Sequence, residues 1–301
     1  MEAERLVKLS SKLSRREPGA QLWLIEHTAR NGSTADTLRH YDTLLRTKPD
    51  ASAVLFPRLL NAIEDQDVRQ SLTPYMRLNR SWTVSFLNFA LYKSKNLPAL
   101  NALIVQNGGF PNTESAQEQT KQLLARLTAE KLFSEARIFF LLLPRATPAR
   151  LRSADFDKFD VNAQFGAMGW VISPTADAAF DLDSAALAKR PSLSLRVAPA
   201  TTTVIATRLM YLLPGDYHFA AKLAQLELST KGALRWQMRC AAQNGQPVFW
   251  SVDTLNMSIS TALPIPANCP EQMLEIVASG GEARAGLEAV VSSVAITAKS
   301  M

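Results

Sequence analysis

The segment from Leu209 to Cys269 contains the clearest strand and turn signals of the chain. It begins with Leu-Met-Tyr-Leu-Leu-Pro-Gly-Asp-Tyr-His-Phe (209–219), continues with Leu-Arg-Trp-Gln-Met-Arg-Cys (234–240) and ends with Leu-Pro-Ile-Pro-Ala-Asn-Cys (263–269). Apolar residues recur at every second position of the first two segments, which is typical of strands that bury one face. We expect Pro214-Gly215 to turn between two neighbouring strands in the middle of one sheet.

The length and composition describe a globular protein of two domains. A chain of 301 residues is long enough for two cores, since a domain takes roughly 100 to 200 residues. With 47% hydrophobic and 20% charged residues, the chain is neither disordered nor membrane-spanning. No apolar run approaches the roughly 18 residues that cross a bilayer, and the N-terminus lacks the apolar segment of a signal peptide. We therefore expect either a cytoplasmic protein or one whose signal or anchor has been removed.

The charge is distributed unevenly along the chain. Residues 1–150 hold 21 basic and 14 acidic side chains, whereas residues 151–301 hold 12 and 13. A basic half can bind nucleic acid or another polyanion, and such binding would depend steeply on salt. The basic residues here are spread one or two per helical turn and do not interleave with aromatic ones, as a strand-binding surface requires. We expect solvated helix faces and no nucleic-acid partner.

The first half of the chain has helical periodicity. Apolar residues recur at spacings of three and four, and Gly or Pro separates one run from the next. The expected helices cover 1–15, 20–30, 33–48, 51–71, 81–94, 97–106, 113–130 and 131–143. Short connections between helices of this length indicate a degenerate α-solenoid over residues 1–146. We interpret Trp82, Phe86 and Phe89 as its core and not as a peptide-binding groove.

The periodicity changes from 3.6 to 2 after Pro144-Arg-Ala-Thr-Pro148. The expected strands cover 156–165, 180–182, 193–197, 205–213, 217–223, 234–240, 274–278, 287–291 and 294–296. Strands that each bury one face, with no helices between them, pack as an antiparallel sandwich. The fold class is therefore α plus β in two domains, with a jelly-roll-like β-sandwich over residues 150–299.

Three of these segments resemble a family of bacterial, mainly alphaproteobacterial, tetratricopeptide-like proteins. They are Leu212-Leu-Pro-Gly-Asp-Tyr217, Trp236-Gln-Met-Arg-Cys240 and Ile265-Pro-Ala-Asn-Cys269, and Leu38-Arg-His-Tyr-Asp-Thr-Leu-Leu-Arg-Thr-Lys-Pro49 also matches. The resemblance implies helical repeats followed by a jelly roll similar to carbohydrate-binding domains. It also implies an N-terminal membrane segment, export, and for some members a place in exopolysaccharide systems. This chain departs from the pattern because it lacks the membrane segment.

Cys240 and Cys269 are the two cysteines of the chain. The first ends an alternating strand and the second lies in a turn between prolines, so a crosslink between strand and turn is plausible. It would close a loop of about 30 residues and stabilise the domain by roughly 3 to 4 kcal/mol. The alternative is a pair of buried free thiols in a cytoplasmic protein. We favour the disulfide.

The sequence shows no catalytic constellation, cofactor motif or metal-ligand spacing. It has no nucleophile elbow, phosphate-binding loop or dinucleotide fingerprint, and its three histidines are scattered. Asp155, Asp157 and Asp160 have the chemistry of calcium ligands, but we interpret them as turn or solvent positions. Asp181 and Asp183 share one face of a strand, as two glycosidase carboxylates can, yet an ordinary half-buried strand explains them better. We expect no enzyme, no cofactor and no metal.

A sugar-binding face needs an aromatic platform beside hydrogen-bonding groups. Trp170 and Trp236 lie in apolar patterns and read as core. Phe249 and Trp250 follow a turn-forming stretch and precede Asp253, which resembles an aromatic loop tip beside polar groups. We therefore name these three residues as ligand-binding candidates, while favouring a packed role for the aromatic pair.

Two functional hypotheses follow. In the first, the protein is a non-enzymatic scaffold or binding protein of the periplasm or cell envelope, in exopolysaccharide assembly or export. Its helical half docks a protein partner and its sandwich contacts that partner or a polysaccharide, while a missing N-terminal anchor is its only link to the membrane. The alternative is a carbohydrate-active enzyme with its site at the domain junction.

Overall fold

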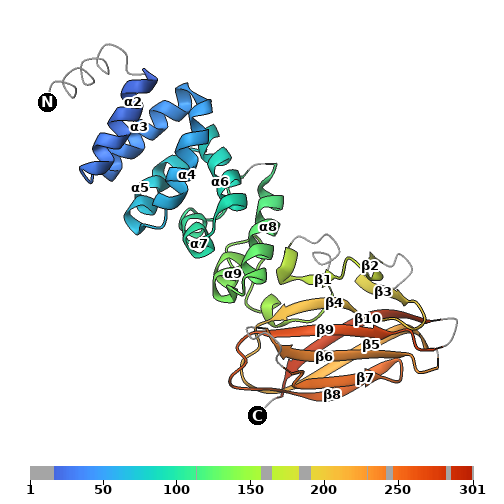
Figure 1. Cartoon of the computed structure of the whole chain (residues 1–301). Coiled ribbons are helices and arrows are strands. Elements are labelled where there is room, and N and C mark those ends of the chain that lie inside the picture. The colour runs from blue at the N-terminus through green and yellow to red at the C-terminus, as the bar shows by residue number, and fades with distance from the viewer. Residues whose placement is uncertain are drawn as a thin grey trace. The chain divides into compact units, whose positions relative to one another are not determined.

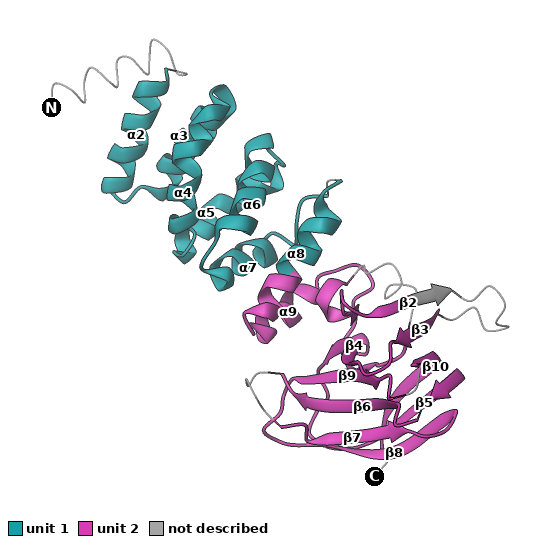
Figure 2. Cartoon of the chain, turned by 45° about the vertical axis from the view of Figure 1, so that its right-hand side comes forward, with its two compact units in different colours: residues 1–123 teal, residues 124–301 magenta. Residues whose placement is uncertain are grey.

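The chain forms two compact units, residues 1–123 and 124–301, which we call the helical unit and the sandwich unit (Figures 1 and 2). The computed structural model describes residues 17–112, 114–156, 165–182, 191–228, 230–241, 247–282 and 286–299. The predicted helix at 1–15 lies outside them. The units divide within helix α8 (Ala116–Ala129), so helix α9 (Phe133–Phe140) groups with the strands. As limits of independently folding domains, 1–146 and 150–299 stay predictions.

The described part of the helical unit contains six complete α-helices and the start of α8. They are α2 (Pro18–Arg30), α3 (Thr34–Thr47), α4 (Ser52–Ala62), α5 (Gln66–Arg77), α6 (Ser81–Lys93) and α7 (Leu97–Gln106), with a short 3-10 helix, η1 (Pro49–Ala51), before α4. The single helix expected over 51–71 is wrong. The chain breaks after Ile63, and the Asp65 carboxylate restarts it by accepting the N–H of Asp67 at 2.7 Å.

The helices pack through their apolar faces. α2 lies against α3, and then α3 contacts α5, α4 contacts α6 and α5 contacts α7. The predicted core role of the α6 aromatic residues is confirmed for Trp82 and Phe86, which are buried, while Phe89 is half-buried and its ring lies 5.7 Å from that of Phe56. Contacts between next-but-one helices are what stacked helix pairs produce. The degenerate α-solenoid stays a prediction.

The described part of the sandwich unit contains two five-stranded antiparallel sheets. Their strands are labelled in Figure 1. Sheet A has the order β1-β4-β9-β6-β7 and sheet B the order β2-β3-β10-β5-β8. The strands are β1 (Trp170–Ile172), β2 (Asp177–Leu182), β3 (Pro191–Val197), β4 (Thr202–Met210), β5 (Gly215–Leu228), β6 (Ala233–Cys240), β7 (Trp250–Thr254), β8 (Ser258–Ile265), β9 (Gln272–Ser279) and β10 (Leu287–Ala298). Two short 3-10 helices, η2 (Arg150–Arg152) and η3 (Gly166–Met168), precede β1. The antiparallel sandwich is confirmed.

The hairpin predicted at Pro214-Gly215 is wrong. β4, before this turn, pairs with β1 and β9 in sheet A, whereas β5, after it, pairs with β10 and β8 in sheet B. The segment therefore carries the chain from one sheet to the other. Alternating strands on either side of Pro-Gly do not specify which strands will pair, because the partners of β4 and β5 lie far along the sequence.

Several other expected strands differ from those in the structure. The structure has strands β7 and β8 where the sequence indicated a loop and a turn. Of the strand expected over 156–165, Phe156 and Phe165 are described and belong to no strand, while 157–164 lie outside the described residues. The segments expected over 287–291 and 294–296 form one strand, β10, whose register with β5 shifts between Val290 and Ser293.

The core of the sandwich lies between the inward faces of the two sheets. Trp236 is fully buried at its centre, with its ring 5.2 Å from that of Phe219 on sheet B and 6.4 Å from that of Trp170. Large apolar side chains buried in this way each contribute about 1.5 to 3 kcal/mol. Because β6 alternates, burying Trp236 and Met238 leaves Arg235, Gln237 and Arg239 on the outer face of sheet A.

Candidate functional site

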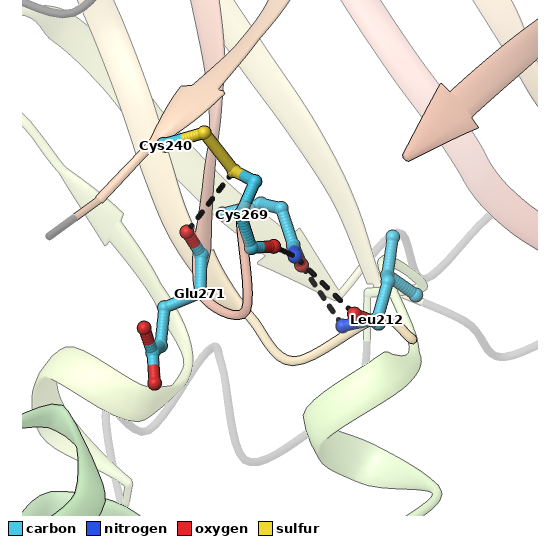
Figure 3. Close-up of a disulfide and its surroundings, with 5 residues drawn as sticks. Leu212, Cys240, Cys269 and Glu271 are labelled. Carbon is cyan, nitrogen blue, oxygen red and sulfur yellow. Dashed lines mark hydrogen bonds between the residues drawn. A yellow bond between two sulfur atoms is a disulfide. The ribbon is translucent and has the colours of Figure 1, made fainter. Parts of the chain in front are cut away.

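Cys240 and Cys269 form a disulfide (Figure 3), with Cα atoms 5.3 Å apart and a sequence separation of 29. The crosslink joins the last residue of β6 to the turn before β9. It confirms the predicted disulfide over the alternative of two free thiols. Closing a loop of this length stabilises the folded state by roughly 3 to 4 kcal/mol in the chain-entropy model.

The aromatic candidates lie within the sandwich and not at a loop tip. Trp250 is the first residue of β7, is 9% exposed, and donates its indole N–H to the Ala262 carbonyl at 2.8 Å. Its ring lies 4.9 Å from that of Phe219. Phe249 is half-buried against the same core. The sequence left two interpretations of Trp250, a packed aromatic or a platform for a ligand. The structure fits the packed aromatic, because a ring buried to this extent offers no open face for stacking. A ligand role for Phe249 stays a prediction.

Asp253 lies on the outer face of sheet A, opposite Arg235 of the neighbouring strand. Two hydrogen bonds join them, Arg235 Nε to Asp253 Oδ1 at 2.6 Å and Arg235 Nη2 to Asp253 Oδ2 at 3.3 Å. Their side chains are 49% and 43% exposed, so this pair contributes about 0.2 to 1 kcal/mol to stability. Its polar atoms stay accessible to a ligand.

A second polar group lies beside this pair. Glu275 of β9 accepts from Arg239 Nε at 2.8 Å and from Gln237 Nε2 at 2.7 Å. Its side chain is only 4% exposed although it lies on the outer face, because its neighbours cover it. The buried carboxylate fixes the positions of Gln237 and of Arg239, whose side chain is 42% exposed. We call Arg235, Gln237, Arg239, Asp253 and Glu275 the outer polar cluster.

The register of sheet A extends the cluster into a row across its strands. Thr207 pairs with Glu275, Glu275 with Gln237, and Gln237 with Ser251. The row presents a hydroxyl, a carboxylate, an amide and a second hydroxyl in sequence. The cluster has two guanidinium groups and two carboxylates, so its formal charge balances. Such a surface can exchange hydrogen bonds with a neutral polar ligand and has no net attraction for a polyanion.

The other polar residues singled out by the sequence form no comparable group among the described residues. Asp155 is described, whereas Asp157, Asp160 and Asp183 lie outside the described residues, as does the side chain of Asp181. The histidines are separate: His27 stacks on Trp23, His40 bonds Gln21, and His218 bonds Ser260. In the described part of the chain, no three His, Cys, Asp or Glu side chains come together as a metal site would require.

The sequence contains a signal for three members of the cluster. In 234–240 the apolar residues indicate the core, and Arg235, Gln237 and Arg239 alternate with them. Their alternation already assigned them to one outward face. Glu275 could not be found in this way, because only the pairing of β9 with β6, two strands far apart in sequence, brings it to them.

The helical unit contains a separate cavity of about 350 Å³ between α2, α3, α4 and α5. Its wall is mainly apolar and includes Ile25, Leu38 and Leu59. Glu26 and Arg58, which also line it, form an ion pair at 3.4 Å. No helix among the described residues is both long and apolar enough to cross a membrane.

No family model matches the chain, and no curated protein matches its sequence. Similar solved structures include a carbohydrate-binding module, TmCBM61, in complex with β-1,4-galactotriose, with 11% identity and a TM-score of 0.33; the match covers 49% of this chain and 100% of that one. A second is the CBM22-1 xylan-binding domain of Xyn10C from Paenibacillus barcinonensis, with 10% identity and a TM-score of 0.32; the match covers 44% of this chain and 88% of that one. A third is CBM27-1 of Caldicellulosiruptor saccharolyticus in complex with mannohexaose, with 8% identity and a TM-score of 0.31; the match covers 48% of this chain and 96% of that one. At this similarity no ligand carries over to this chain.

Proposed function

We propose that the protein is a non-enzymatic binding protein whose sandwich unit holds a neutral polysaccharide on the outer face of sheet A. The observation that carries this proposal is the outer polar cluster, in which a buried carboxylate orients an arginine and a glutamine beside an exposed Arg–Asp pair. Sugar hydroxyls both donate and accept hydrogen bonds, so they can pair with each of these groups. Preorganised polar side chains lower the entropic cost of binding.

The binding mode differs from the one the sequence indicated. Trp170, Trp236 and Trp250 are all buried, so these indoles provide no stacking platform. Hydrogen bonds alone compete directly with water and give modest affinity per contact. We therefore expect recognition of an extended polysaccharide through several sugar units and weak binding of a monosaccharide.

The setting that we propose is the cell envelope, in the assembly or export of exopolysaccharide. The disulfide supports it, since disulfides persist in oxidising compartments such as the periplasm. The resemblance to alphaproteobacterial tetratricopeptide-like proteins supports the same setting. The helical unit would dock a protein partner, and its apolar cavity supplies a surface for an apolar side chain of that partner.

Binding of neutral polysaccharides to the full chain tests the proposal, first on a glycan array and then by calorimetry. Arg239→Met and Asp253→Asn should each weaken binding about 10- to 100-fold, the effect of losing one charge-assisted hydrogen bond. Arg196→Met is the matched control, because Arg196 forms a 2.8 Å ion pair with Glu288 on the outer face of sheet B. Absence of glycan binding, or equal loss in the control, would overturn the proposal.

The helical docking surface has its own test. Ala29→Trp places an indole at the cavity and should reduce recovery of partner proteins from envelope extracts. Ala53→Trp, at an exposed position of α4 that does not line the cavity, should leave recovery unchanged. Capture of cytoplasmic proteins alone, or equal effects of both variants, would contradict this part of the proposal.

A further inference from the structure

The disulfide is the first member of a chain of contacts that reaches helix α9. Gln272, the first residue of β9, is completely buried and contacts both cysteines. It pairs across the strands with Cys240, and its side-chain amide donates to the carbonyl of Cys269. The crosslink therefore fixes Gln272 through two different segments of the chain.

Gln272 in turn holds the segment that joins the two sheets. Its Oε1 accepts the N–H of Leu212 at 2.9 Å, and its Nε2 donates to the carbonyl of Leu212 at 3.2 Å. Leu212 is buried outside any strand, so these backbone groups have no ladder partner in a sheet. A buried peptide group without partners costs free energy, and one glutamine supplies both partners here.

The residue before Leu212 attaches helix α9. Tyr211 donates its hydroxyl to the carbonyl of Phe133, the first residue of α9, at 2.9 Å. The Arg137 guanidinium, also on α9, lies 5.9 Å from the centre of the tyrosine ring. The Tyr211 N–H donates to the carbonyl of Leu151 at 2.9 Å. One tyrosine thus holds both α9 and the segment that follows it.

We propose that the Cys240–Cys269 disulfide is a redox-sensitive latch that keeps α9 attached to the sandwich. The latch consists of Cys240, Cys269, Gln272, Leu212 and Tyr211. In the oxidised protein the crosslink fixes Gln272, and through it Leu212 and Tyr211. A dithiol reductant delivers two electrons and two protons, breaks the S–S bond, leaves two thiols and is itself oxidised to a disulfide. The turn that carries Cys269 is then no longer tied covalently to β6, so its carbonyl restrains Gln272 less tightly and α9 loosens.

Reduction should act on α9 and not on the sandwich as a whole. The pairing of β6 with β9 continues from Cys240 to Ala233 through eight aligned residue pairs, and none of the other seven involves a cysteine. The core between the sheets lies along the length of these strands. By contrast, α9 is only 8 residues long, too short to be stable without its tertiary contacts. Its loosening would expose Phe133, Phe139 and Phe140, which are buried in the oxidised form.

Hydrogen exchange of the full chain, with and without dithiothreitol, tests the latch. Amides of residues 136–140 should exchange at least about tenfold faster after reduction. Amides of β10 at 291–294 and of α6 at 87–91 are internal references and should not change. A Cys240→Ala/Cys269→Ala variant should show the fast exchange without reductant and no response to it. Unchanged exchange in α9, or equal acceleration in β10, would overturn the latch.

A second variant separates the latch from a general loss of stability. Tyr211→Phe keeps the buried ring and removes the hydroxyl that holds Phe133, so it should accelerate exchange in α9 with the disulfide intact. Because it acts later in the same chain of contacts, reduction should then add little further acceleration. Independent, fully additive effects of the substitution and of reduction would contradict the proposal.

Discussion

The helical unit and the sandwich unit bury similar side chains but connect them over different distances in sequence. Helices of the first unit contact their neighbours and next-but-one neighbours, such as α3 with α5. In the sandwich, β10 pairs with β3 and β5, and β4 pairs with β9. Where contacts are local in sequence, one group of helices can unfold without the rest of the unit. Long-range strand pairing makes the strands of a unit unfold together. The two units should therefore differ in cooperativity more than in burial.

The largest expected effect is the loss of Trp236. Trp236→Ala should destabilise the sandwich by about 3 to 5 kcal/mol, because it removes a fully buried indole from between the sheets. Hydrogen exchange should show the loss in strands of both sheets. Trp236→Phe should cost much less, since the indole nitrogen has no hydrogen-bond partner in the described structure.

Phe86→Ala is the matched substitution in the helical unit, where Phe86 is equally buried. Its effect on exchange should be strongest in α6 and in α4, which holds the neighbouring Phe56, and should decrease toward α2. Uniform loss of protection throughout the helical unit, or a purely local loss in the sandwich after Trp236→Ala, would remove the difference in cooperativity.

A smaller effect is expected from the polar contact that joins α3 and α6. Trp82 donates its indole N–H to Asp42 Oδ1 at 2.9 Å, and the Asp42 side chain is 13% exposed. Trp82→Phe should destabilise the helical unit by about 1.5 to 3 kcal/mol, the range for a hydrogen bond to a charged group. Chemical denaturation followed by circular dichroism measures this, with Trp23→Phe on α2 as a control that should cost less. If Trp82→Phe and Trp23→Phe destabilise the protein equally, lost packing and not the lost hydrogen bond explains the effect.

The smallest expected effect is a difference in pH response between the units. Burial raises the pKa of the Glu271 carboxyl above its ordinary value of 4.5, and Arg137 partly offsets the shift. The folded sandwich unit thus holds this proton more tightly than the unfolded chain. The resulting stability is fully present below pH 4.5 and is lost as the pH rises through the folded pKa.

The helical unit should respond in the opposite direction. Burial, with help from Arg39, lowers the pKa of His40 below 6.5, against the weaker effect of Asp36. Stability from neutral His40 is present above pH 6.5 and is lost as the pH falls through the folded pKa. Denaturation midpoints across pH, compared with Glu271→Gln and His40→Gln, measure both contributions. Midpoint profiles that neither substitution alters would contradict the assignment.

Local patterns predicted those features that depend on neighbouring residues. Six helix predictions between residues 20 and 143 match α2, α3, α6, α7, α8 and α9 within a few residues, because caps and apolar spacing act over one or two turns. The alternation in 234–240 placed Trp236 in the core. The same local information failed at Pro214-Gly215. A Pro-Gly turn fits both a hairpin within one sheet and a connection between two sheets, so it does not distinguish them.

The candidate site shows the same limit. The sequence indicates Asp253 as a ligand-binding candidate beside a loop; it lies in β7 on the outer face, beside Arg235, and its ligand role stays a prediction. Trp250 was placed in a loop but begins β7, because its ring finds Phe219 on the opposite sheet. No spacing rule connects residues that meet only when two sheets close on each other.

Patterns along the chain are enough to indicate the change from helix to strand, the outward direction of Arg235, Gln237 and Arg239, and two cysteines in the segment from Leu209 to Cys269. Only the folded structure shows which strands pair, which carboxylate lies beside Arg239, and which residues the disulfide holds. Periodicity is a property of neighbouring residues and is therefore written in the chain. Pairing depends on a core assembled from distant segments, and its free energy exists only when those segments are together.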